Sequence, residues 1–331
     1  NDVYFQQMIP IKKLDFKLRT PEYFQYKAYQ NLKSSYLPDL QYDYKERRIT
    51  VAGVDHASVT AKRRKAEYNS SELAFKENWT VLEAENIPAL ADESYVTSLS
   101  NYAASIKLEL QQIRLPNTPY KSYSTTWDKV TKTIYENDGF GGELNKGSYY
   151  KNDLDALLSG TSKPEVIINK IFNYVKSKVK YNNLNGYYAD KGVRKAYKEG
   201  EGNVADINLM LISMLRYAGI NANPILVSTI GNGTPLFPTR KGFNYVVCHI
   251  GLNGGEILLD ATKKYSTENI ISTKALNWQG RLVKKDGSSE WVKILPNENS
   301  KHTTMISASL NEDFTTKGSV RSQQTLYNAF E

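Results

Sequence analysis

The chain has 331 residues, of which 40% are hydrophobic and 24% charged, a composition typical of soluble globular domains. No run reaches the roughly 18 to 20 apolar residues of a membrane-spanning helix. The formal net charge is +8, but the basic residues are scattered, and the densest run extends only from Lys62 to Lys65. Nucleic-acid-binding proteins concentrate positive charge on one face, so the pattern argues against a nucleic-acid partner.

Cysteine and histidine usage limits the chemistry of the chain. The single cysteine, Cys248, excludes an intrachain disulfide and a cysteine-rich metal site. The three histidines, His56, His249 and His302, lie far apart without metal-ligand spacing, so we expect neither a metal nor another cofactor. The chain opens on Asn1 and stops within an unfinished β pattern, which we interpret as a fragment of a longer protein.

Residues 1–120 are predicted to form a β-rich, sandwich-like domain. Residues 12–18 and 106–113 alternate polar and apolar side chains, as half-buried strands do. Shorter strands are expected at 24–29, 44–51 and 79–85. A polar connector rich in Lys, Ser and Glu is predicted from about residue 55 to 78.

Residues 121–298 are predicted to form an α+β domain, with a further β region at 299–331. Helices are expected at 127–137 and 154–158, and a third should begin at a capping box, Ser162-Lys-Pro-Glu165. The apolar face of this third helix comprises Ile168, Ile171, Phe172, Val175 and Val179. Two strands, 223–230 and 243–250, are followed by Asn253-Gly254, a two-residue hairpin signal, and by a returning strand at 256–261.

The segment Gly200–Ile220, GEGNVADINLMLISMLRYAGI, is the most informative of the chain. A glycine-containing turn precedes an apolar helix whose core side is predicted to include Ile207, Leu211 and Met214. This layout is typical of a helix that presents a nucleophile at its first residue, where the partial positive charge of the helix N-terminus stabilises a thiolate. The first residue here is Val204.

This segment, the following strand and the hairpin ending in Leu259-Asp260-Ala261-Thr262 resemble the bacterial transglutaminase-like family, which has a papain-like cysteine-protease fold. The resemblance covers residues 125–295. It implies that Val204 occupies the position of the catalytic cysteine, Tyr245 that of the histidine, and Asp260 that of the orienting aspartate. It also implies a periplasmic or cell-surface location, because a β-rich domain commonly precedes this fold in bacterial secreted or surface proteins.

The two substitutions predict a catalytically inactive protein. Valine has no lone pair with which to attack an acyl group, and tyrosine, with an unperturbed pKa of about 10, is a poor general base near neutral pH. We expect Asp260 to accept a hydrogen bond from the Tyr245 hydroxyl instead of orienting an imidazole. The first hypothesis is therefore a binding or structural module whose former cleft holds a peptide or polysaccharide.

The second hypothesis is a cysteine-independent hydrolase, peptidase or amidase that uses His249 with a serine such as Ser213 or Ser228. The hairpin register places Tyr245 and His249 on one face, both diagonal to Asp260, so the register leaves a displaced base open. The same register directs Cys248 to the opposite face, where we expect a small buried hydrophobic residue.

Five residues are candidates for ligand binding: Asp206, Tyr187, Tyr188, Tyr245 and His249. Each also has a structural interpretation. A carboxylate in the first turn of a helix, such as Asp206, is favoured by the helix dipole alone. With 24 tyrosines in the chain, Tyr187 and Tyr188 are also consistent with an amphipathic surface.

Overall fold

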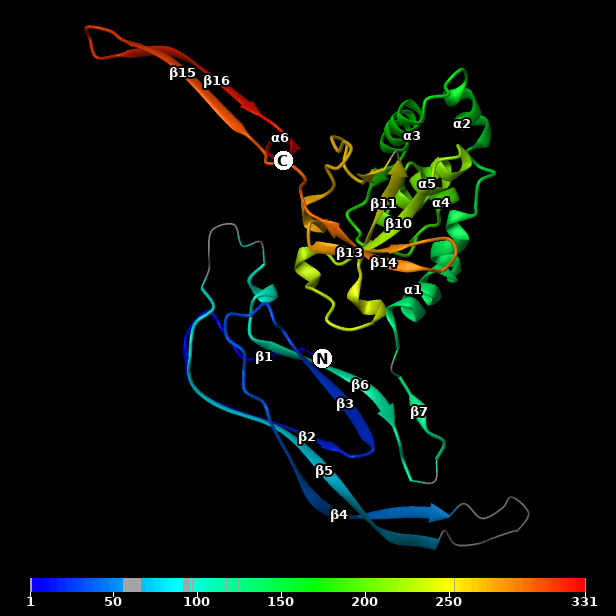
Figure 1. Ribbon diagram of the computed structural model, residues 1–331, viewed down its shortest axis with the longest axis vertical. Helices are drawn as coiled ribbons and strands as arrows, with labels where there is room; N and C mark the ends of the chain where they lie inside the picture. Colours follow the sequence, from blue (N-terminus) through cyan, green and yellow to red (C-terminus); the bar gives the residue numbers. More distant parts are fainter. Residues whose placement is uncertain are drawn as a thin grey trace. The chain divides into compact units, whose positions relative to one another are not determined.

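The computed structural model describes residues 2–55, 67–91, 96, 98–116, 118–123, 125–252 and 254–330 (Figure 1). The chain divides into two compact units, Asn1–Ser124 and Thr125–Glu331. A β-rich first part is followed by a mixed α/β second part, which confirms the predicted fold class. Across the residues that the structure describes, no helix is both long enough and apolar enough to cross a bilayer.

The first unit contains two antiparallel sheets. One has the order β1-β6-β3, with β7 paired to β6, and the other has the order β2-β5-β4. A small core of Phe5, Leu40, Leu82, Ala104 and Ile106 draws on both sheets. The strands are β1 (Asp2–Tyr4), β2 (Ile11–Pro21), β3 (Phe24–Gln30), β4 (Gln41–Asp55), β5 (Glu67–Ile87), β6 (Ser105–Ile113) and β7 (Lys121–Ser122), with the 3-10 turn η1 (Leu99–Asn101) before β6.

The predicted polar connector is largely strand. β4 and β5 form one long hairpin, paired from Gln41↔Val81 to Asp55↔Glu67, so residues 67–78 belong to β5. Residues 56–66 lie outside the described part of the chain. From residue 72 to 78, β5 exposes or half-exposes most side chains on both faces. Only Leu73 and Phe75 supply large apolar side chains in alternation here, too short a run to predict a strand.

The second unit is built on a five-stranded antiparallel sheet of order β12-β11-β10-β13-β14. Its strands are β10 (Ala222–Val227), β11 (Tyr245–Leu252), β12 (Gly255–Leu259), β13 (Trp278–Val283) and β14 (Ser289–Ile294). The helices are α1 (Trp127–Tyr135), α2 (Lys151–Leu158), α3 (Pro164–Lys178), α4 (Val193–Glu199) and α5 (Val204–Tyr217), with a short π-helical turn η2 at Asp138–Gly142. Short 3-10 turns are η3 (Ile230–Asn232), η4 (Arg240–Gly242) and η5 (Thr273–Ala275), and a parallel pair joins β8 (Lys180–Tyr181) to β9 (Glu201–Gly202).

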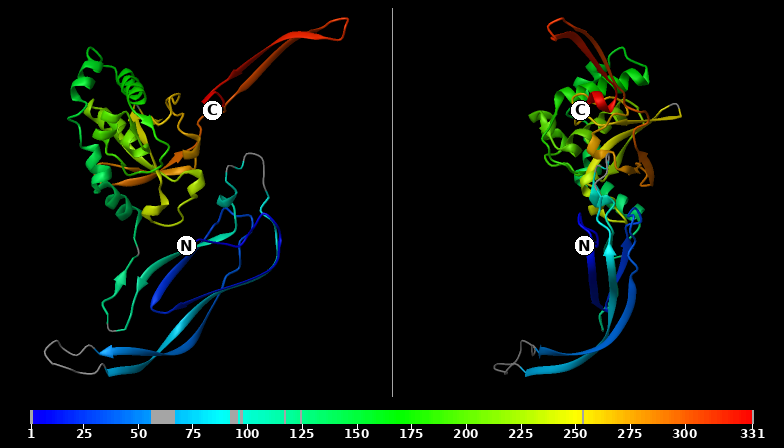
Figure 2. Two further views of the ribbon diagram at one scale, coloured as in Figure 1. Left: turned by 180° about the vertical axis from the view of Figure 1, so that it is seen from behind. Right: turned by 90° about the vertical axis from the view of Figure 1, so that its left-hand side faces the viewer.

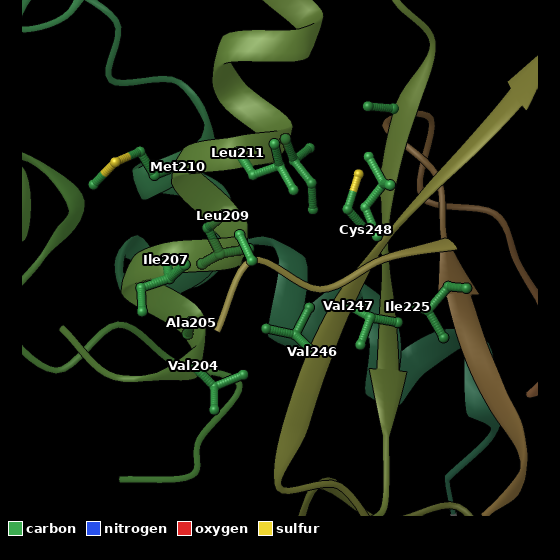
Figure 3. Packing of buried hydrophobic residues seen from close by; sticks show 14 of the residues in the cluster. Val204, Ala205, Ile207, Leu209, Met210, Leu211, Ile225, Val246, Val247 and Cys248 are labelled. Carbon is green, nitrogen blue, oxygen red and sulfur yellow. The ribbon is translucent and has the colours of Figure 1, made fainter. Parts of the chain in front are cut away.

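Helix α5 is the centre of this unit because it is buried on nearly all sides. Every residue from Val204 to Leu215 is buried. The helix packs on β10 and β11 and also against α3 and α4. Figure 3 shows Leu211 of this helix on the side of Cys248 in β11, whereas Met210 points away from the strands. Burial all round explains why the segment is apolar beyond a single amphipathic stripe.

The capping box predicted for α3 was wrong. Helix α3 begins with Pro164 in its first turn, but its N-cap is Lys163, which makes no side-chain capping bond, so the predicted Ser162–Glu165 box does not form. The predicted apolar face of α3 is buried. A reciprocal capping box instead starts α5, where Asn203 and Asp206 each accept a hydrogen bond from the other's backbone N–H.

The predicted hairpin register between β11 and β12 is confirmed. Leu252 pairs with Gly255 and Cys248 with Leu259, and Gly254 has a φ of 78°. Asn253 itself lies outside the described residues. Beyond the sheet, β15 (His302–Leu310) and β16 (Thr316–Gln324) form a separate two-stranded hairpin, followed by the short helix α6 (Tyr327–Phe330), as Figure 2 also shows.

Gly280 in β13 is a close-packed point of the sheet. A methyl group there would lie 2.4 Å from Ile225 Cγ2 and 2.5 Å from Ile294 Cδ1. We therefore expect Gly280→Ala to lower the free energy of unfolding by about 1–3 kcal/mol through overpacking, measured by urea denaturation. Gly251→Ala is the matched control, because nothing lies within 4 Å of its added methyl group. Equal effects of the two substitutions would contradict this packing.

Candidate functional site

The carboxylate of Asp260 is fully buried at the end of β12, where it accepts four hydrogen bonds. Oδ1 accepts from Asn208 Nδ2 at 3.0 Å and from the Thr262 N–H at 3.1 Å. Oδ2 accepts from the Tyr245 hydroxyl at 2.9 Å and from the Ser272 N–H at 3.1 Å. The predicted bond between Tyr245 and Asp260 is thus confirmed. These donors occupy both oxygens of the carboxylate.

Tyr245 is fully buried and held in a chain of hydroxyl groups. Its single proton goes to Asp260, so the Thr262 hydroxyl, 2.9 Å away, donates to the Tyr245 oxygen. Burial is the main cause that raises the pKa of Tyr245 well above its ordinary value, and the Asp260 charge adds to it. The phenol therefore stays neutral and does not act as a base at physiological pH.

Asn208, which sequence reasoning missed, joins helix α5 to this network. Its amide group donates to the Val246 carbonyl at 2.8 Å as well as to Asp260, and its Oδ1 accepts from the Ala261 N–H at 2.9 Å. Val204 lies four residues earlier, and residues at this spacing share a helix face. Val204 therefore lies on the same face of α5 as Asn208, which contacts Asp260, and Asp260 in turn contacts Tyr245.

Val204, Tyr245 and Asp260 are shielded from solvent. Val204 is fully buried, and its N–H donates to the Leu184 carbonyl at 3.3 Å. The ammonium group of Lys274 lies 5.1 Å from the centre of the Tyr245 ring. This ammonium donates to the Tyr181 hydroxyl and to Asn185 Oδ1, both at 2.8 Å. The loop after β8 thus contacts Val204, and the Lys274 side chain covers the Tyr245 ring.

Asp206 has a structural role at the start of α5. Its Oδ2 accepts from the N–H groups of Asn203, at 3.0 Å, and Lys191, at 3.3 Å. Burial raises the pKa of Asp206, and these backbone donors oppose the shift. The carboxylate therefore fixes the helix start, in agreement with the structural interpretation of a first-turn acid.

His249 lies in β11 beside Glu256, at 3.7 Å from its carboxylate, and neither ring nitrogen has a hydrogen-bond partner. Burial is the main cause that lowers the pKa of His249, and Glu256 opposes the shift. Neither proposed serine contacts this ring. Ser213 bonds to Tyr150 and to the Lys146 carbonyl, and Ser228 bonds to Gly233 and Asn232.

Cys248 is fully buried among apolar side chains between the sheet and α5, as Figure 3 shows. Burial raises the pKa of its thiol, so a reactive thiolate does not form. Tyr187 and Tyr188 pack against each other with ring centres 4.4 Å apart. The Tyr187 hydroxyl donates to the Arg240 carbonyl, and the Tyr188 carbonyl accepts from Asn203.

A surface pocket of about 590 Å³ adjoins the network. Thr262 and Tyr181 belong to both the pocket and the closed site. None of the five residues predicted to bind a ligand lines this pocket. The lining side is formed by the end of α3, β8 and the loop after Asp260: Asn173, Lys176, Ser177, Val179, Lys180, Tyr181, Asn183, Ala261, Thr262, Lys263 and Lys264. The lining contains four lysines and no carboxylate.

Comparison with known proteins identifies the fold of this unit. Residues 154–266 match the family model of the transglutaminase-like superfamily. No match was found among curated proteins. The chain therefore carries a transglutaminase-like domain, as its sequence predicts.

Two solved structures are similar to the chain. One, from Parabacteroides distasonis, is described as a candidate protease. It matches with a TM-score of 0.48 and 13% sequence identity, and the match covers 89% of this chain and 47% of that protein. The chain thus spans about half the length of that protein. The other, from Cytophaga hutchinsonii, is described as a candidate cysteine protease. It matches with a TM-score of 0.28 and 11% sequence identity, and the match covers 98% of this chain and 93% of that protein.

Asn208 should contribute more to stability than Tyr245. Asn208→Ala leaves a buried carboxylate oxygen, a buried carbonyl and a buried N–H each short of a partner, and we expect a loss of about 2–4 kcal/mol. Tyr245→Phe removes one donor from Asp260 Oδ2, which still accepts from the Ser272 N–H. We expect this variant to lose about 1–2 kcal/mol of unfolding free energy. Urea denaturation of both variants beside the native protein measures the difference. A larger loss for Tyr245→Phe would contradict the central place of Asn208.

Proposed function

We propose that the chain is a catalytically inactive transglutaminase-like protein that binds an extended acidic peptide in the pocket beside its closed triad positions. The observation that carries the inactivity is the saturated Asp260 carboxylate, with Tyr245 in place of a base and Val204 in place of a nucleophile. Acyl transfer through a thiol needs a lone pair at the first residue of α5, and valine offers none. Secretion or surface display remains part of this proposal.

The peptide is inferred from the backbone that lines the pocket. Lys180 and Asn182 donate their N–H groups to β9, at the Gly200 and Gly202 carbonyls. In a parallel pair the intervening residue directs its N–H and C=O to the other side, so the peptide groups of Tyr181 face the free edge of β8. An extended peptide pairs with such an edge through its own backbone.

The acidic character is inferred from the lysines. Lys180 and Lys263 are exposed, and no carboxylate lines the pocket with them. Lys176 is held toward the protein, because its ammonium donates to the Ser266 carbonyl at 2.7 Å. Side chains of Asp or Glu on a bound peptide would supply the missing counter-charges.

The inactivity is tested with acyl-donor peptides and an amine acceptor. We expect no transamidation or peptide hydrolysis by the native protein, and none by Cys248→Ala, whose thiol is buried. Val204→Cys combined with Tyr245→His restores a thiol at the helix N-terminus and an imidazole near Asp260, and we expect a covalent acyl-enzyme detectable by mass spectrometry. Turnover by the native protein would overturn the proposal of inactivity.

The binding is tested by fluorescence anisotropy with labelled acidic and basic octapeptides. We expect the acidic peptide alone to bind, and Lys180→Gln with Lys263→Gln to weaken its affinity about fivefold, because two exposed ion pairs are lost. Lys129→Gln with Lys293→Gln removes the same charge from exposed positions elsewhere and is the control. Equal weakening by both double variants, or preference for the basic peptide, would contradict the site. Binding of a neutral glycan in place of the peptide would also contradict it.

A further inference from the structure

We propose that a second pocket of the transglutaminase-like domain binds an acidic oligosaccharide, a sugar chain that carries sulfate or carboxylate groups. The pocket has a volume of about 770 Å³ and shares no lining residue with the pocket beside Asp260. It lies where the segment 144–151, the helix α4, the C-terminal end of α5 and the turn between β13 and β14 meet.

Positive charge gathers in this pocket from elements far apart in the sequence. Its lining contains five cations and no Asp or Glu: Lys146, Lys151, Arg194, Arg216 and Lys285. In the sequence these residues belong to the scattered excess of basic residues, and only the fold brings them together. Converging cations from four separate elements are the electrostatic complement of a ligand with several negative groups.

Most of this charge is not neutralised by the protein. Arg216 is held in place by uncharged acceptors, the Ala222 carbonyl at 2.7 Å, Asn223 Oδ1 at 2.9 Å and the Tyr135 hydroxyl at 3.2 Å. Its geometry is therefore fixed while its charge stays available. Among the described residues, the exposed side chains of Arg194 and Lys285 form no hydrogen bond or ion pair.

The remaining two cations are held more closely. Lys146 pairs with Glu143 at 2.6 Å, and the Lys151 ammonium lies 5.6 Å from the centre of the Tyr217 ring. The electrostatic attraction for a ligand therefore depends mainly on Arg194, Arg216 and Lys285. Of these three, only Arg194 and Lys285 are free to be replaced without removing internal hydrogen bonds.

Aromatic rings form the wall of the pocket and favour a sugar over a bare anion. Tyr149 and Tyr150 pack edge to face with ring centres 4.9 Å apart, and Tyr150 and Tyr217 do so at 5.9 Å. Tyr217 is 42% exposed, so part of its ring is open to a ligand. A volume of this size fits a small oligosaccharide, and pockets for small ligands commonly measure roughly 300–1,000 Å³.

The lysine and arginine side chains of the pocket favour an acidic sugar over a neutral one. Lysine and arginine side chains only donate hydrogen bonds, so they match sulfate and carboxylate groups, which only accept when ionised. A single phosphate ion would engage one or two of these cations and leave the others unmatched. A chain of acidic sugars carries several negative groups and so engages several of the lining cations at once.

A neighbouring pocket of about 450 Å³ extends the surface along which such a chain would run. It shares Lys146 and Arg194 with the 770 Å³ pocket. It adds Lys191, Lys195 and Lys198, together with the acids Glu143 and Asp190. Lys191 and Lys195 are paired with Glu199, so the 450 Å³ pocket is closer to neutral than the 770 Å³ pocket. We therefore place the tightly bound, most acidic part of the chain in the larger pocket.

The test uses the full chain and four probes in isothermal titration calorimetry: a heparin-derived sulfated tetrasaccharide, a tetragalacturonate, neutral maltotetraose and inorganic tripolyphosphate. We expect binding of the sulfated or the uronate sugar, with the tighter of the two identifying the anionic group. Maltotetraose should not bind, and tripolyphosphate should bind at least tenfold more weakly than the better sugar, an affinity difference of about 1.4 kcal/mol.

Two double variants locate the site. Arg194→Gln with Lys285→Gln should weaken binding of the acidic sugar by about tenfold, because two charge-assisted contacts are lost. Lys129→Gln with Lys293→Gln removes the same charge from other exposed positions and should weaken it less than twofold. Thermal unfolding checks that both variants are folded.

Several outcomes would overturn the proposal. Equal weakening by both double variants would mean that net charge alone attracts the sugar. Absence of binding by both acidic sugars, or tighter binding of tripolyphosphate, would also exclude an acidic oligosaccharide. Because Lys180→Gln with Lys263→Gln leaves this pocket unchanged, that variant should keep full affinity for the sugar even if the peptide proposal fails.

Discussion

The buried carboxylate of Asp260 is the group on which the arrangement of the second unit depends. An ionised carboxylate in a protein interior is costly unless donors surround it. Here side chains from α5 and β11 and backbone N–H groups of the loop after β12 supply those donors. The three elements are consequently held at one point, and the Ser266 hydroxyl adds a bond to the Asp260 carbonyl at 2.6 Å.

The same network explains how an acid can persist in a site without its base. In a catalytic member of the family, the aspartate would orient an imidazole that changes its charge during the reaction. Under the proposed assignment, Tyr245 stands at the position of that imidazole and is a donor of fixed protonation, because burial raises the pKa of its phenol. Asp260 then contributes to stability, and replacing it would remove an acceptor from four buried donors, of which Asn208 keeps the Val246 carbonyl.

The sequence predicted the parts of the fold that depend on local pattern. The Tyr245–Asp260 bond was expected from the family resemblance, and the hairpin signal with the two-residue period of a strand made the two residues diagonal neighbours. Asn208 could not be found in this way, because an asparagine within a helix gives no local signal and its partner Ala261 is 53 residues away. The extension of β5 was missed because its alternating large apolar residues are only two, Leu73 and Phe75, among polar neighbours.

The distribution of positive charge could not be predicted from the sequence, because the fold gathers cations that are scattered along the chain. A surplus of 8 positive charges spread over 331 residues favours an ordinary solvated surface, and that interpretation excluded nucleic acid. In the folded domain, four lysines line one pocket and five cations line another, with no carboxylate in either lining. Under the proposed function, this domain has valine where the resemblance places a nucleophile, and most of the cations in its two pockets have no carboxylate partner, so it is better suited to holding acidic ligands than to transforming them.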